Sequence, residues 1–97
     1  MIDALVSGRV FGDPEQRLGK GNTPFVVAKV RAPANDGETV LVNVIAFDDA
    51  PSAALLALRD GDAVALAGSL TPKVWTDKQG NTRPALDMVA QRVLSVA

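Results

Sequence analysis

Residues 40–59 decide the fold, and they read VLVNVIAFDDAPSAALLALR. The first part, Val40–Phe47, is rich in β-branched and apolar residues, a composition typical of a strand. The second part, Ser52–Arg59, is rich in Ala and Leu, follows Pro51 and precedes Gly61 by two positions. That pattern predicts one short helix that begins near Pro51. A strand followed by a single helix is therefore the central feature of the chain.

Further strands are expected on both sides of this segment, because turn signals rich in Gly, Pro, Asn and Asp separate short β-branched runs. The runs span Ala4–Phe11, Phe25–Ala32, Ala63–Leu70, Val74–Thr76 and Ala85–Val96, the last broken or bent near Gln91 and Arg92. One helix between the third and fourth strands of a small all-β domain is the layout of a five-stranded Greek-key barrel. We expect one domain of this kind over residues 1–97.

Composition excludes several classes of function. The chain has no Cys and no His, which removes disulfides, the usual zinc sites and the Ser-His-Asp and Cys-His arrangements. Asp48 and Asp49 precede the helix, where acidic residues favour the N-terminus, so we do not assign them to a metal site. We expect no catalytic residue, no metal and no cofactor. No signal peptide and no apolar run of about 18 residues is present, which favours a soluble cytoplasmic protein.

Charge argues mildly against a nucleic-acid ligand. The formal net charge is −1 and the sequence pI is about 5.2, whereas nucleic-acid binders usually carry a basic footprint. The ten Lys and Arg residues would therefore have to gather on one face of the domain.

Side-chain alternation gives two strands a clear apolar face and a mixed second face. The second faces carry Phe25, Lys29 and Arg31 in one strand, and Leu41, Asn43, Ile45 and Phe47 in the next. An ordinary solvated face would show few large apolar groups, so this mixture favours a binding surface. Phe47 and Phe25 are open to a second interpretation, since phenylalanine in a strand usually belongs to the core.

Trp75, the only tryptophan, follows Lys73 by two positions and precedes Lys78 by three. At strand spacing Lys73 and Trp75 share a face, so the indole could stack on a base, worth roughly 1–3 kcal/mol, while the ammonium meets a phosphate. The alternative is that Trp75 packs in the core or at a subunit interface. Arg17 and Lys20 lie in a Gly-containing loop that could follow a phosphate backbone or simply form a solvated hairpin.

Three segments together resemble the bacterial single-stranded-DNA-binding protein (SSB) family, which is related to the primosomal replication protein PriB. Residues 8–17, GRVFGDPEQR, are close to the family's run glycine-x-x-x-x-Asp-Pro-Glu-x-Arg. Residues 44–47, VIAF, match its Val-Val-x-Phe strand end, and residues 73–83, KVWTDKQGNTR, resemble its Lys-Trp-Thr-Asp-x-x-Gly-x-x-Arg hairpin with one residue inserted after Lys73. The resemblance covers nearly the whole chain.

The resemblance implies an oligonucleotide-binding (OB) fold, base stacking at Trp75 and Phe47, and backbone contacts from Arg17, Lys73 and Arg83. It also implies a homotetramer built from dimers that pair through the first strand. Leu41 stands where many relatives carry an aromatic residue, which removes part of the stacking platform. The sequence ends at Ala97, so we expect no acidic tail of the kind that recruits replication proteins in relatives.

Two functional hypotheses follow. The first is sequence-independent binding of single-stranded DNA in replication, recombination or repair, by a dimer or tetramer. This hypothesis expects no membrane contact and allows replication proteins as partners. Its ligand contacts would come from Trp75, Phe47, Arg17, Lys73, Arg83, Lys29, Arg31, Lys78 and Lys20. The alternative is a PriB-like OB module that acts mainly through protein–protein interaction, which the low aromatic content and acidic pI favour.

Overall fold

The computed structural model describes residues 2–95, apart from the side chains of Trp75 and Ser95. Strands and one helix occupy most of this range. The elements are β1 (Ile2–Val10), β2 (Glu15–Leu18), the 3-10 turn η1 (Lys20–Asn22), β3 (Pro24–Pro33), β4 (Thr39–Ala46), α1 (Asp49–Leu56), β5 (Ala63–Thr76) and β6 (Thr82–Ser95). The predicted all-β class, with one helix between central strands, is confirmed.

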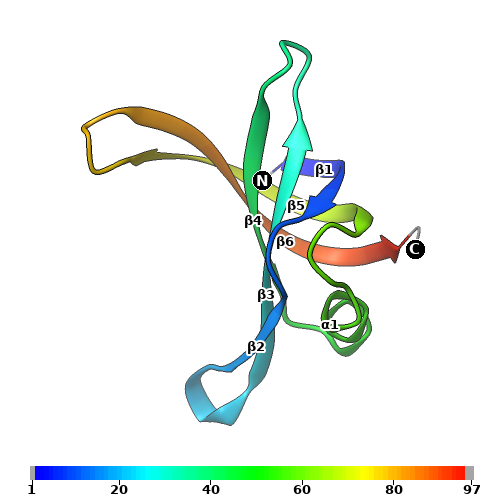
Figure 1. The fold of residues 1–97 in the computed structure, drawn as a ribbon. Helices are drawn as coiled ribbons and strands as arrows, with labels where there is room; N and C mark the ends of the chain where they lie inside the picture. Colours follow the sequence, from blue (N-terminus) through cyan, green and yellow to red (C-terminus); the bar gives the residue numbers. More distant parts are fainter. Residues whose placement is uncertain (1, 96–97) are drawn as a thin grey trace.

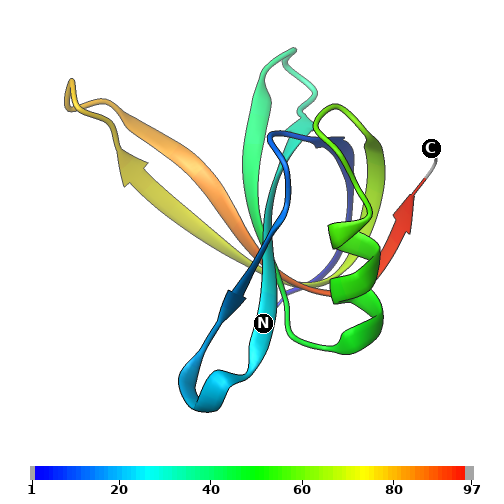
Figure 2. The ribbon, with the colours of Figure 1, turned by 60° about the horizontal axis from the view of Figure 1, so that its bottom comes forward.

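The strands form one sheet in the order β1-β5-β6-β4-β3-β2, and an additional pairing of β1 with β3 closes it into a barrel. All neighbours are antiparallel except β4 and β6, which run parallel. Figures 1 and 2 show α1 on the opposite side of the barrel from the long β5–β6 hairpin. This is the closed Greek-key arrangement that the order of elements predicted.

The core follows directly from side-chain alternation. Val26, Val30, Val42 and Val44 are almost completely buried, as the predicted apolar rows of these two strands require. Leu55 of α1 is buried in the same cluster, and the helix packs against β3, β4 and β6. Each such side chain contributes roughly 1.5–3 kcal/mol of transfer free energy when removed from water. The second face of the same strands is therefore left free for other contacts.

Several element boundaries differ from the sequence-based expectation. The runs predicted at Ala63–Leu70 and Val74–Thr76 are one continuous strand, β5. Pro72 is tolerated there because it lies beyond Leu70, the last residue that pairs with β1, and proline fits a strand with a free edge. The helix begins at Asp49, two residues before the start expected near Pro51. Pro51 fits the first turn of the helix because no backbone donor is needed there.

Two further local features concern β2 and β6. The short, polar strand β2 was not predicted, and it pairs with β3. In β6 the register shifts where Ala67 pairs with Arg92 and Gly68 with Ala90, which leaves Gln91 as an extra residue. This bulge is the bend predicted near Gln91, and it lets the strand curve around the barrel.

The barrel closes at a point where one backbone passes very close to another. A Cβ on Gly8 would collide with the carbonyl group of Arg31 on β3. Glycine at this position lets β1 approach β3 closely enough for Val10 to pair with Val30.

Gly8→Ala is therefore expected to destabilise the protein by about 1–3 kcal/mol, because the added methyl forces the β1 and β3 backbones apart. Urea denaturation of the purified protein measures this change. Gly19→Ala is the matched control, since a Cβ there meets only ordinary van der Waals contacts. Equal stability of the two variants would contradict the role assigned to Gly8.

Candidate nucleic-acid interface

The outer face of β3 and β4 forms the floor of an open groove. Val27 pairs with Ile45 and Lys29 with Asn43 across the two strands, and all four side chains line the groove. The predicted second face of these strands is thus confirmed as a surface separate from the core. The groove has a volume of about 1050 Å³, at the upper end of the range for small-molecule pockets.

The walls of this groove come from elements distant in sequence. On one side lie Phe11 and the β2 residues Glu15 and Arg17. On the other side lie Thr71 of β5 and Asp87 of β6. The backbone N–H of Phe11 donates to the carbonyl oxygen of Lys29 at 2.8 Å, which fixes this aromatic residue at the border of the groove.

Phe47 presents an exposed aromatic ring just beyond the end of β4. It follows β4, its side chain is 54% exposed, and its ring lies 6.2 Å from that of Phe25 at an interplanar angle of 43°. Phe25 is half-buried and supports the exposed ring from one side. Trp75 belongs to β5, opposite Arg83 of β6; its side chain lies outside the described part of the structure, so its predicted stacking is an untested expectation.

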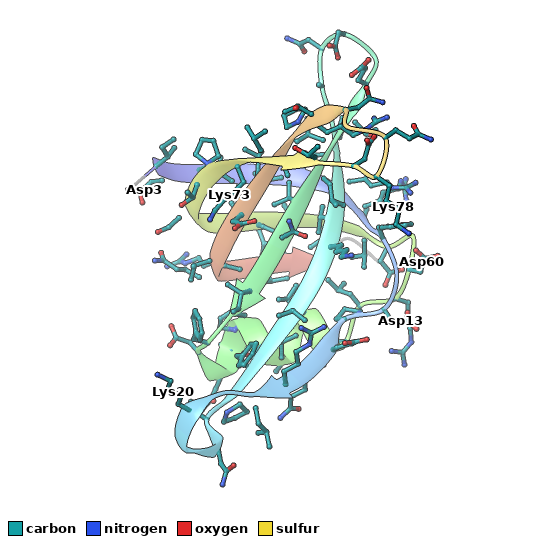
Figure 3. The ribbon with its side chains drawn as sticks, turned by 90° about the vertical axis from the view of Figure 1, so that its left-hand side faces the viewer. Asp3, Asp13, Lys20, Asp60, Lys73 and Lys78 are labelled. Carbon is teal, nitrogen blue, oxygen red and sulfur yellow. The ribbon has the colours of Figure 1, made fainter. Side chains whose placement is uncertain are left out.

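The predicted cations are spread along the outer face and do not form one cluster. Arg17 and Lys29 line the groove. Figure 3 shows Lys73 and Lys78 on the β5–β6 hairpin, and Lys20 at the opposite end, after β2. Arg83 lies on the same hairpin, whereas Arg31 lines a second, smaller groove. These positions define a path along the sheet that runs from Lys20 past the groove to the β5–β6 hairpin (Figure 3).

Three of these cations are paired with carboxylates. Arg17 contacts Glu15 at 3.2 Å, Lys73 contacts Asp87 at 3.8 Å and Arg83 contacts Asp77 at 3.5 Å. The Arg17 and Lys73 pairs are exposed on both sides, so each stabilises the fold by at most about 1 kcal/mol. A phosphate would have to compete with these carboxylates for the cations, which reconciles a basic path with an acidic pI.

Sequence reasoning did not identify Asp87 as a groove residue. Its Oδ1 accepts a hydrogen bond from the Asn43 side-chain amide at 3.3 Å, and its Oδ2 faces Lys73. The parallel pairing of β4 with β6 brings Asn43 and Asp87 side by side. That long-range pairing leaves no local signal, although a lone acid within an apolar strand could have indicated an outward-facing position.

The tip of the β5–β6 hairpin is held by Asp77. Its Oδ1 accepts hydrogen bonds from the backbone N–H groups of Gln79 and Asn81, both at 2.9 Å. The side chain of Asp77 is only 18% exposed. The Asn81 N–H, followed by the Gln79 N–H and Arg83, holds the pKa of the Asp77 carboxyl below its ordinary range.

Acidification is expected to loosen this tip. Because the folded-state pKa is lowered, the stabilising effect of Asp77 is fully present above the ordinary aspartate pKa of about 3.9 and is lost as the pH falls through the lowered value. NMR titration of the Gln79 and Asn81 amide shifts measures this transition. Asp77→Asn should abolish it, and a wild-type midpoint above the ordinary value would contradict the assignment.

Within the part of the chain that the structure describes, no group of three or more metal-ligating acidic residues is present. The same residues include no helix that is long and apolar enough to cross a membrane.

Comparison with known proteins gives one family and a set of similar folds. The model of the single-strand binding protein family matches residues 1–96. No curated protein sequence matches the chain. A small single-stranded DNA-binding protein from Streptomyces coelicolor has a TM-score of 0.78 at 22% identity, with 97% of this chain and 93% of that chain covered.

Two further solved structures are similar. An SSB from Plasmodium falciparum in complex with ssDNA has a TM-score of 0.69 at 16% identity, covering 100% of this chain and 96% of that one. The mitochondrial single-stranded DNA binding protein Rim1 from S. cerevisiae has a TM-score of 0.66 at 18% identity, covering 99% of this chain and 97% of that one. At these identities the likenesses show the fold alone, and they confirm the predicted OB fold.

Proposed function

The chain belongs to the single-strand binding protein family, and from this premise we propose that it binds single-stranded DNA without sequence preference in replication, recombination or repair. The resemblance inferred from the three sequence segments is thereby confirmed at the level of the family. One structural observation carries the proposal: the groove on β3 and β4 combines the apolar Val27 and Ile45 with the cations Arg17 and Lys29, and the exposed Phe47 follows Ile45 by two residues.

Binding by this surface needs no sequence-specific contact. Bases would stack on Phe47 and on Trp75, because every base offers a π-face to an aromatic ring. Phosphates would meet Arg17, Lys29 and the hairpin cation Lys73. The remaining predicted cations, Lys20, Arg31, Lys78 and Arg83, would neutralise phosphates farther along the path. The proposed role is passive, since stacking and charge neutralisation hold the strand without a chemical reaction.

Electrostatics should make the interaction strongly dependent on salt. Each neutralised phosphate lowers the slope of log affinity against log salt by about 0.7 for a single strand. The carboxylates paired with Arg17, Lys73 and Arg83 repel an approaching phosphate and so weaken the attraction of these cations for DNA. Because the attraction is electrostatic, we expect tight binding at low salt and a marked loss of affinity towards physiological salt.

Titration with oligo-dT tests the proposed function. Binding is expected to quench the fluorescence of Trp75, the only tryptophan, and Phe47→Ala is expected to weaken binding by roughly 1–3 kcal/mol through the loss of one stacking surface. Fluorescence anisotropy of labelled DNA measures the affinity of both proteins. Leu56→Ala is the matched control, since Leu56 is an exposed apolar residue on α1 and lies outside the groove.

Absence of any affinity for long oligo-dT at low salt would overturn the proposal. That outcome would instead favour the alternative function, a PriB-like module that acts through protein–protein contacts. Binding with unchanged Trp75 fluorescence would retain the function but remove the stacking role from that residue.

We also propose that two copies of the chain associate through β1. This strand pairs with β5 over Ile2–Arg9, but with β3 only at Arg9 and Val10. Its second edge from Ile2 to Gly8 makes no ladder with another described strand. Leu5 is 73% exposed and Leu94 65% exposed on the adjoining outer face. An unpaired edge beside exposed leucines fits a second copy of the same strand.

Leu5→Glu is expected to weaken this dimer at least tenfold, because a buried leucine is worth roughly 1.5–3 kcal/mol and its replacement adds a charge to the interface. Analytical ultracentrifugation measures the change. Leu18→Glu provides the control, since Leu18 is 65% exposed on β2, away from this edge. A monomeric wild-type protein, or equal association of both variants, would overturn the proposed dimer.

A further inference from the structure

Two arginines lie directly opposite each other where the barrel closes. Arg9 of β1 pairs with Arg31 of β3, next to the pair Val10 and Val30. Both valines are buried, so by alternation both arginines face outward, and both are exposed. Like charges directly opposite across two strands are unfavourable on their own. An anion bound between them would offset this repulsion.

The surroundings of the pair hold both guanidinium groups in place. Arg9 Nη1 donates to the carbonyl oxygen of Gly61 at 3.0 Å, and Arg31 Cζ lies 3.9 Å from the centre of the Phe11 ring. Neither contact neutralises charge. The ion pairs among the described residues involve Arg17, Lys73 and Arg83, and none of them involves Arg9 or Arg31.

Both arginines line a second groove of about 680 Å³. Asp60 also lines it, but Asp60 Oδ1 accepts a hydrogen bond from the Gly12 N–H at 2.8 Å, which directs it to the adjoining loop. Phe11 lines both this groove and the larger groove on β3 and β4. The two grooves therefore meet at the ring of Phe11, and the arginine pair lies in the smaller of the two grooves.

We propose that Arg9 and Arg31 together bind a backbone phosphate of the DNA strand after it leaves the larger groove over Phe11. The inference rests on the proposed function and extends the binding path across the β1–β3 seam. Guanidinium groups suit this task because each presents several donors in a planar fork that matches phosphate oxygens. An anion between the two groups also removes their mutual repulsion, so the seam is more favourable with the ligand than without it.

Oligo-dT of two lengths tests this path. We expect a strand of about 4 nucleotides to occupy only the larger groove and one of about 16 nucleotides to continue across the seam, lengths within the range of site sizes for an OB fold. Arg9→Gln is expected to weaken binding of the longer strand about tenfold, as for loss of a charged hydrogen-bonding partner. Binding of the shorter strand should stay at the wild-type level, and the slope of log affinity against log salt for the longer strand should become less steep by about 0.7.

Arg59→Gln is the matched control, because it removes the same charge from a residue outside both groove linings. Melting temperatures of the variants verify the fold. If Arg9→Gln is unstable, Arg9→Lys replaces it; lysine keeps the charge but lacks the planar fork, so an intermediate loss on the longer strand is expected.

The outcomes separate this inference from the proposed function. Wild-type protein that binds neither strand would overturn the function. Wild-type protein that binds both strands, with Arg9→Gln indistinguishable from Arg59→Gln in affinity and salt slope, would overturn the arginine pair alone. A titration with inorganic phosphate is the last measurement. If Arg9→Gln abolishes saturable phosphate binding but leaves the affinity for the longer strand unchanged, the site binds a free anion, and the proposed DNA path is contradicted.

Discussion

Closure of the sheet between β1 and β3 is the constraint on which the other features depend. It consists of two paired positions, Arg9 with Arg31 and Val10 with Val30, and it requires the bare backbone of Gly8 against the Arg31 carbonyl. Once the barrel is closed, alternation divides every strand into an inner and an outer row. The inner rows form the core, and the outer rows of β3 and β4 become the groove floor. The same closure places two arginines side by side.

Local pattern was sufficient to predict the parts of the molecule that depend on alternation. The apolar rows through Val26 and Val44, the mixed outer face with Lys29, and the helix after β4 all follow from short-range sequence. The predicted strand boundaries were less accurate around Pro72 in β5 and for the short strand β2. The runs predicted at Ala63–Leu70 and Val74–Thr76 flank Pro72, yet the free edge of β5 accommodates this proline within one strand. β2 is too short and polar to show any period.

The site was predicted only in part, for a different physical reason. Arg17, Lys29 and Phe47 were identified because each has a local context that marks it. Asp87 and Arg9 acquire their surroundings from pairings between strands far apart in the chain, namely β4 with β6 and β1 with β3. Side-chain alternation predicts the face of the sheet on which a residue lies, but it does not predict which residue lies beside it on the neighbouring strand.

The larger groove lies on the outer face of the sheet. Its floor is a sheet face and its walls are separate hairpins, so no segment of the described chain passes over it to form a ring. A DNA strand can enter such a groove from the side. A continuous chromosome offers stretches of single strand with no free end nearby, and a side-loading surface can bind and release them without threading.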